Sequence, residues 1–172
     1  MSARLTFVLG GARSGKSRHA EHLVRSAGDA PWTYIATAQA FDTEMAERIA
    51  RHRAGRGEGW RTVDAPHDLA GAIGEAQALG APILVDCLTL WLSNRLLSGA
   101  ALDSECDLLV DALGGGPSPV VAVSNEVGLG IVPDNVLSRQ FRDAAGRLHQ
   151  SVAERADRVI LVVAGLPLTV KG

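Results

Sequence analysis

The sequence is poor in lysine, in cysteine and in long apolar stretches, and each shortage excludes a class of protein. Its only lysines are Lys16 and Lys171, and 17 basic residues face 19 acidic ones, which gives a formal net charge of −2. No overall positive field is therefore present to hold a nucleic acid or an anionic membrane. Cys87 and Cys106 are too few and too scattered for a disulfide framework or a zinc site, so we expect both to be reduced.

No apolar run approaches the roughly 20 residues that a membrane-spanning helix needs. The N-terminus leads directly into an apolar strand and lacks the pattern of a signal peptide, so we expect a cytoplasmic protein without membrane insertion. The 172 residues are 47% hydrophobic and 21% charged, a composition typical of soluble globular proteins. We expect one catalytic domain, residues 1–172, large enough to bury its own core.

Short β-branched and aliphatic runs alternate with segments of helical periodicity. The predicted strands are Leu5–Leu9, Trp32–Ala36, Arg61–Asp64, Pro82–Asp86, Val120–Ser124 and Val159–Val163, with a possible antiparallel edge strand at Leu166–Val170. The predicted helices are Lys16–Ser26, Thr43–Arg53, Asp68–Leu79, Leu88–Leu97, Ser104–Leu113 and Asn135–Ala156. This alternation predicts an α/β fold with a mostly parallel sheet and helices on both faces. Ligands of such sheets bind beyond the carboxyl ends of the strands.

A glycine-rich loop follows the first strand and opens the first helix. Its sequence, GGARSGKS, matches the phosphate-binding pattern G-x-x-x-x-G-K-[ST]. The glycines let consecutive amides point at phosphate oxygens, and the helix presents its positive end to the same anion. Lys16 would bridge the outer phosphates and Ser17 would ligate Mg²⁺, whereas Arg13 either contacts phosphate or faces water. The predicted phosphate-binding residues are Gly10, Gly11, Ala12, Arg13, Ser14, Gly15, Lys16 and Ser17.

Asp86 ends the apolar strand Ile83-Leu84-Val85 and is the candidate acidic partner for Mg²⁺. A strand-end aspartate that caps the next helix is the structural alternative, and both roles could coexist. Glu126, after the fifth predicted strand, is a candidate to deprotonate a substrate hydroxyl or to help hold magnesium. A purely structural loop is the competing interpretation there.

Further motifs extend along nearly the whole chain. They include RHAE at 18–21, YIATA at 34–38, His52-Arg53, WRT at 60–62, DCLT at 86–89, SNEVGLGIVP at 124–133, FRDAAGR at 141–147 and GLPL at 165–168. Together these motifs resemble the bifunctional adenosylcobinamide kinase / adenosylcobinamide-phosphate guanylyltransferase family of cobalamin biosynthesis. The Asn125–Pro133 run and the spacing of His52 from the phosphate loop are the most specific parts of the likeness.

The resemblance implies a P-loop NTPase fold similar to that of RecA, assembled as a homotrimer, and two reactions. A hydroxyl of the corrinoid adenosylcobinamide takes a phosphoryl group from ATP or GTP, with Mg²⁺. The phosphate product then receives GMP from GTP through a guanylylated histidine, which matches His52 here. Further nucleotide contacts are expected at the ends of the second and third strands and in the chain between them: Ala36, Thr37, Ala38, Arg53, Ala54, Gly55, Arg56 and Asp64.

A neutral imidazole suits this chemistry, because it can attack the α-phosphorus and its ordinary pKa is near 6.5. Guanidinium groups at Arg48, Arg51, Arg53 and Arg56 could balance charge on the transferring group. Without the family likeness, the segment would be interpreted as an exposed amphipathic helix. Some relatives carry two adjacent histidines where this chain has Arg51-His52, so His52 alone can serve. We assign the other histidines to the surface or to helix packing: His19, His22, His67 and His149.

Two other functions compete with the family interpretation. A different small-molecule P-loop kinase shares the length and the loop, but it has no use for His52. A GTP-binding switch module would need a base-recognition motif such as N-K-x-D, and neither lysine follows an asparagine.

Overall fold

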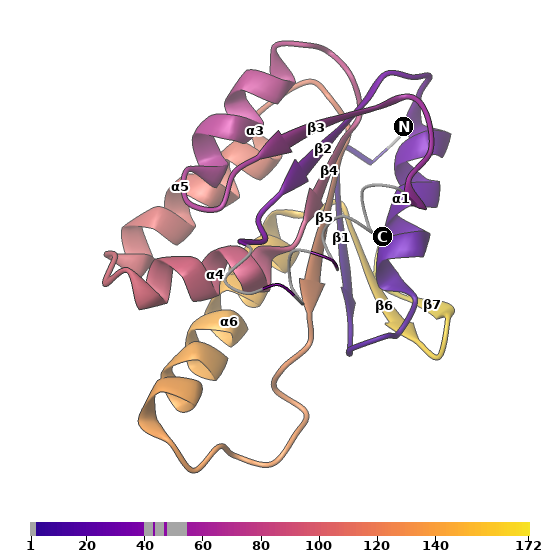
Figure 1. Ribbon diagram of the computed structural model, residues 1–172. Coiled ribbons are helices and arrows are strands. Elements are labelled where there is room, and N and C mark those ends of the chain that lie inside the picture. Colours follow the sequence, from indigo (N-terminus) through magenta and orange to yellow (C-terminus); the bar gives the residue numbers. More distant parts are fainter. Residues whose placement is uncertain (1–2, 40–42, 44–46, 48–54) are drawn as a thin grey trace.

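The computed structural model describes residues 3–39, 43, 47 and 55–172, and a seven-stranded sheet organises them (Figure 1). The sheet order is β3-β2-β4-β5-β1-β6-β7, with every neighbouring pair parallel except β6 and β7. The strands are β1 (Leu5–Gly10), β2 (Trp32–Ala36), β3 (Trp60–Asp64), β4 (Ile83–Asp86), β5 (Val120–Asn125), β6 (Arg158–Val163) and β7 (Leu166–Lys171). The predicted antiparallel hairpin at the end of the chain is therefore confirmed.

The helices are α1 (Lys16–Ala27), α3 (Leu69–Gln77), α4 (Leu88–Leu97), α5 (Leu102–Gly114) and α6 (Val136–Arg155). The predicted helix Thr43–Arg53 lies outside the described residues apart from positions 43 and 47. Capping explains two small boundary differences. Asp68 and Asn135 precede their helices as N-caps, and each side chain accepts a hydrogen bond from a backbone amide three residues on.

Helices cover both faces of the sheet, as predicted (Figure 1). On one face, α3, α4, α5 and α6 bury a core that includes Phe7, Ile73, Trp91 and Leu148. On the other face, α1 packs on a smaller core that includes Val24. Because the central strands are buried on both faces, their nearly continuous apolar sequences are the pattern expected of a parallel sheet.

The strand register brings the carboxyl ends of the central strands to one edge. Gly10 pairs with Asn125, and Ala36 pairs with Asp86. The backbone amide of Glu126 then donates to the Gly10 carbonyl at 3.0 Å. Side chains that follow four different strands are thereby gathered around the start of α1, where the candidate site lies.

Both cysteines are free, and Cys87 is buried at the end of β4. Among the described helices, none is both long and apolar enough to cross a lipid bilayer.

Candidate active site

The phosphate loop connects β1 to α1 in a conformation that depends on its glycines. A Cβ on Gly10 would collide with the Ser14 side chain and lie 2.8 Å from the Val162 carbonyl oxygen. Gly15 has φ +91°, a left-handed conformation, and it is the residue directly before α1. The first turn of α1 therefore directs its unpaired amides at the loop, which is the arrangement that binds phosphate.

Lys16 is buried, and only 8% of its surface is exposed to solvent. Its Nζ donates to the Gly11 carbonyl at 3.1 Å, so the ammonium group lies across the loop. Because the partner of this buried ammonium group is a neutral carbonyl, its positive charge is available to bind an anion that enters the loop. This position agrees with the predicted role of Lys16 at the outer phosphates.

A cavity of about 500 Å³ opens beside the loop and collects most of the predicted catalytic residues. Its walls include these predicted residues: Ala12, Arg13, Lys16, Ser17, Ala38, Asp86 and Glu126. The other predicted residues are not among those that line it. Gly10, Gly11, Ser14 and Gly15 belong to the phosphate loop itself. Ala36, Thr37 and Arg56 are buried, Gly55 and Asp64 are exposed elsewhere, and His52, Arg53 and Ala54 lie outside the described residues.

Asp86 lies at the end of β4 with its carboxylate in the cavity, and the helix-capping alternative is wrong. The N-cap of α4 is Cys87, and no side chain caps this helix end. Instead, Asp86 Oδ2 accepts a hydrogen bond of 2.9 Å from the Tyr34 hydroxyl. Ser17 and Asp86 line the same cavity and offer the hard oxygen ligands that Mg²⁺ prefers, so the residues present fit this ion.

Mg²⁺ needs few protein ligands, because it keeps several waters and binds substrate phosphates. Within the described ranges no group of three or more histidine, cysteine or acidic residues could hold a metal ion. A Mg²⁺ site formed by the Ser17 hydroxyl, the Asp86 carboxylate and the nucleotide phosphates does not need such a group.

Tyr34 joins Asp86 to a buried arginine. The Arg56 guanidinium carbon lies 3.5 Å from the centroid of the Tyr34 ring, and Arg56 is 5% exposed. Its Nη1 is buried and has no hydrogen-bond partner. Burial, reinforced by the Asp86 carboxylate, raises the pKa of Tyr34, so its hydroxyl stays protonated and acts as a donor. No role was predicted for Tyr34 from the sequence, because its partner Asp86 lies 52 positions away.

A buried polar network fixes the backbone beneath the cavity. The Thr37 hydroxyl donates to the Cys87 carbonyl at 2.7 Å and accepts from the Cys87 amide at 2.9 Å. Asn125 Nδ2 donates to the Thr89 hydroxyl at 2.8 Å, which ties β5 to α4. Thr37 therefore holds the turn after Asp86, and its side chain does not face the cavity. Burial, with the Asp86 charge, raises the pKa of Cys87 to about 11, so this thiol stays protonated and unreactive.

Glu126 lines the cavity, and its carboxylate also shapes the next turn of chain. One oxygen accepts from the Gly128 amide at 2.6 Å, and the other accepts from the Leu129 amide at 3.1 Å. Glu126 therefore has the structural role in this loop that was the alternative to catalysis. This role does not remove Glu126 from the cavity wall, because each carboxylate oxygen has a second lone pair.

The end of the chain supports the phosphate loop, which the sequence analysis did not predict. The amide of Gly165, in the turn between β6 and β7, donates to the Ser14 carbonyl at 2.8 Å. A Cβ on Gly15 would lie 3.3 Å from Gly165 Cα, so the two glycines pass very close to each other. The β6–β7 hairpin therefore packs directly on the loop that binds phosphate.

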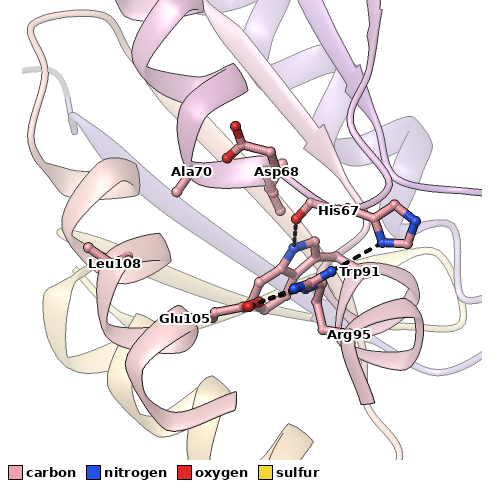
Figure 2. Close-up of a pocket in the computed structure, with 8 residues that line it drawn as sticks. His67, Asp68, Ala70, Trp91, Arg95, Glu105 and Leu108 are labelled. Carbon is pink, nitrogen blue, oxygen red and sulfur yellow. Dashed lines mark hydrogen bonds and ion pairs between the residues drawn. The ribbon is translucent and has the colours of Figure 1, made fainter. Parts of the chain in front are cut away.

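A second cavity, of about 300 Å³, lies on another side of α4, and four of its lining residues are paired with one another: His67, Trp91, Arg95 and Glu105 (Figure 2). Arg95 makes two hydrogen bonds of 2.6 Å to Glu105, which lower the pKa of the glutamate. The Trp91 indole donates to the His67 carbonyl at 2.8 Å. These contacts join α4 to α5 and to the chain after β3, and none of the predicted catalytic residues lies in this cavity.

The comparisons with known proteins agree with the geometry. The family described as cobinamide kinase / cobinamide phosphate guanyltransferase matches residues 6–170. The bifunctional adenosylcobalamin biosynthesis protein CobP of Pseudomonas aeruginosa is 53% identical over 96% of both chains. The bifunctional adenosylcobalamin biosynthesis protein CobU of Salmonella typhimurium is 45% identical, over 97% of this chain and 99% of its own.

Solved structures confirm the fold at low sequence identity. The P4 protein of bacteriophage phi6, in complex with ADP, gives a TM-score of 0.53 at 14% identity, and a type III secretion ATPase gives 0.54 at 16%. The chain spans about half the length of these structures, 53% and 56%, and the likeness supports the α/β P-loop NTPase fold alone. Fold, site and sequence relatives agree that the chain belongs to the cobinamide kinase / cobinamide phosphate guanyltransferase family of enzymes.

Proposed function

We propose that this enzyme phosphorylates adenosylcobinamide with ATP or GTP and then transfers GMP from GTP to the product through His52. The observation that carries the proposal is the cavity that unites Lys16, Ser17 and Asp86 at the phosphate loop. The membership of the cobinamide kinase / guanyltransferase family supports both half-reactions.

In the kinase step, the corrinoid hydroxyl attacks the γ-phosphorus, the bond to the β-phosphate oxygen breaks, and a nucleoside diphosphate leaves. Lys16 and the amides of the loop stabilise the charge on the transferring group. Glu126, in the cavity wall, is the proposed acceptor of the hydroxyl proton. Bound Mg²⁺, held by Ser17 and Asp86, would neutralise charge on the β and γ phosphates.

In the guanylyl step, a ring nitrogen of His52 attacks the α-phosphorus of GTP and pyrophosphate leaves. A phosphate oxygen of adenosylcobinamide phosphate then attacks the same phosphorus and the P–N bond breaks. Adenosylcobinamide-GDP and free histidine are the products. The further nucleotide contacts that we propose are Ala36, Thr37, Ala38, Arg53, Ala54, Gly55, Arg56 and Asp64.

The decisive experiment uses GTP labelled at the α-phosphate. Wild-type protein should retain labelled GMP and release pyrophosphate, and the label should be lost in acid but persist in alkali, as a phosphoramidate does. His52→Ala should lose the label and the guanylyl transfer but keep kinase turnover. His22→Ala, which removes an exposed histidine of α1, is the matched control and should label normally. If the wild type forms no adduct with any nucleotide, the guanylyltransferase half is wrong and a plain kinase remains.

We also propose that the enzyme works as a cytoplasmic homotrimer that binds no nucleic acid. Sedimentation velocity of the purified protein tests the assembly, and a monomer at all concentrations would contradict it.

A further inference from the structure

The kinase reaction fixes where the acceptor must enter the cavity. The phosphate loop, with Lys16 and Ser17, lines the cavity together with Glu126, Val127 and Phe141. A hydroxyl that attacks in line must approach from the side opposite to the leaving group. Because Glu126 is the proposed acceptor of the hydroxyl proton, the acceptor hydroxyl must lie close to the segment that connects β5 to α6. This step rests on the proposed function.

The cavity cannot hold a whole corrinoid. Its volume is about 500 Å³, within the range of roughly 300–1,000 Å³ that suits drug-sized ligands. A corrin macrocycle with its cobalt, axial ligands and amide side chains is much larger than such a ligand. The hydroxyl-bearing arm can enter the cavity, and the macrocycle must remain at its mouth.

The chain that leaves the cavity wall at Val127 exposes an unusual run of apolar side chains. Leu129 is 85% exposed, Ile131 is 96% exposed and Val132 is 65% exposed. This segment extends away from the sheet between β5 and α6 (Figure 1). Three large apolar residues within four positions are a candidate binding surface, because such clusters on soluble proteins commonly bind a ligand or partner.

Polar contacts at both ends hold this segment in shape. The Glu126 carboxylate binds the amides of Gly128 and Leu129, and Arg142 Nη2 donates to the Gly128 carbonyl. At the other end, Arg139 Nη1 donates to the carbonyls of Pro133 and Asp134 at 3.0 and 2.8 Å. The apolar side chains therefore point outward from a segment whose backbone is tied to the cavity wall and to α6.

We propose that Leu129, Ile131 and Val132 bind the apolar face of the corrin macrocycle while its aminopropanol arm enters the cavity. A flat macrocycle with amide groups at its rim can bury its face on this surface and leave the amides in water. Continuity with the cavity wall favours this ligand over a second copy of the chain. The exposed apolar residues Leu166 and Leu168 lie on β7, an edge strand that β1 and β6 separate from β5, and they have no such continuity.

The test is the double variant Leu129→Ser, Ile131→Ser, with Leu97→Ser as the control. Leu97 is also exposed, at 63%, but it ends α4 outside the cavity. The double variant should raise KM for adenosylcobinamide about tenfold, equivalent to about 1.4 kcal/mol. The Kd for a non-hydrolysable GTP analogue and the rate of GMP labelling at His52 should not change, because neither needs the corrinoid. Equilibrium dialysis of adenosylcobinamide, followed by its visible absorbance, measures the same loss without turnover.

An unchanged KM and an unchanged dialysis constant for adenosylcobinamide would overturn the inference. A loss of corrinoid binding that occurs only because the double variant dissociates in sedimentation velocity would also overturn it, since the surface would then be an interface between copies. Failure of the proposed function would look different: the wild type itself would neither phosphorylate adenosylcobinamide nor form the GMP adduct.

Discussion

The Tyr34 hydroxyl donates a 2.9 Å hydrogen bond to Asp86 Oδ2 from the neighbouring strand of the sheet. Both side chains line the cavity beside the phosphate loop, and the Arg56 guanidinium lies over the tyrosine ring. The hydrogen bond leaves Asp86 with free lone pairs toward the cavity while it limits rotation of the carboxylate. We therefore regard Tyr34 as a residue that positions Asp86.

Tyr34→Phe should weaken the binding of Mg²⁺ with nucleotide about tenfold and leave the fold intact. The variant keeps the ring beneath Arg56 and removes one hydrogen bond to a charged group, an interaction worth about 1.5–3 kcal/mol. Calorimetric titration of Mg²⁺ in the presence of a non-hydrolysable GTP analogue measures the change directly.

A double-variant cycle with Asp86→Asn separates positioning from packing. If Tyr34 acts through the carboxylate, Tyr34→Phe should have little further effect on Mg²⁺ binding in the Asp86→Asn background. Asp86→Asn itself should reduce kcat far more than it lowers the melting temperature, because no helix cap is lost. Equal losses from Tyr34→Phe in both backgrounds would show that the hydroxyl does not act through Asp86.

Arg56→Lys should weaken nucleotide binding although it keeps the positive charge. Arg56 is buried with a flat contact on Tyr34 and an unpaired Nη1, and an ammonium group can reproduce neither the stacking nor the forked donor geometry. We expect a loss of about tenfold in GTP affinity, of the order found for one charge-assisted hydrogen bond. Arg61→Lys, at an exposed position on β3, is the control and should bind GTP normally. Wild-type affinity in Arg56→Lys would limit the residue to a packing role.

The two lysines of the chain offer a matched pair. Lys16→Ala should abolish both activities and weaken nucleotide binding, because one phosphate cradle serves both steps. Lys171→Ala should keep both activities and lose stability by up to about 1 kcal/mol, since Lys171 Nζ donates to two carbonyls at the C-terminal end of α6. Normal kinase turnover in Lys16→Ala would mean that Gly10–Ser17 is not the triphosphate site.

The elements that the sequence predicted well are those with local signals. The phosphate loop, the apolar strands and the amphipathic α6 follow from residues close together in the chain, so their places were correct within two or three positions. The helix caps Asp68 and Asn135 moved boundaries only slightly. The family likeness, which was confirmed, supplied the identity of the reaction, because a phosphate loop alone indicates only a nucleotide.

The features that sequence reasoning missed all depend on contacts between distant residues. Tyr34 and Asp86 are 52 positions apart, and the Gly165 amide reaches Ser14 across most of the chain. No local pattern encodes such a pair, because the strand order must be known before the two strand ends can be placed together. His52 stays a prediction, since it lies outside the described residues.

His149 provides a prediction about pH. Its ring packs near Phe7, with the ring centroids 5.7 Å apart, and its Nε2 lies 2.8 Å from the buried Ser124 hydroxyl. Burial lowers the pKa of His149, although the nearby Glu126 carboxylate acts in the opposite direction. The folded protein therefore binds fewer protons at this ring than the unfolded chain does, wherever the pH lies between the lowered value and about 6.5.

Stability should consequently fall as the pH is lowered from 7.5 to 5.5, because the unfolded state gains the proton first. His149→Gln places an amide group near the position of Nε2, so it keeps a hydrogen-bonding partner for Ser124 and removes the titration. Its free energy of unfolding should therefore depend less on pH, by up to about 1 kcal/mol over this interval. Burial also lowers the pKa of His19, and both proteins retain that contribution, so the difference between them isolates His149. Urea unfolding of both proteins at the two pH values measures the difference. Identical pH dependence would show that the His149 ring titrates alike in the folded and unfolded states. A steeper dependence in His149→Gln would reverse the sign of the assigned shift.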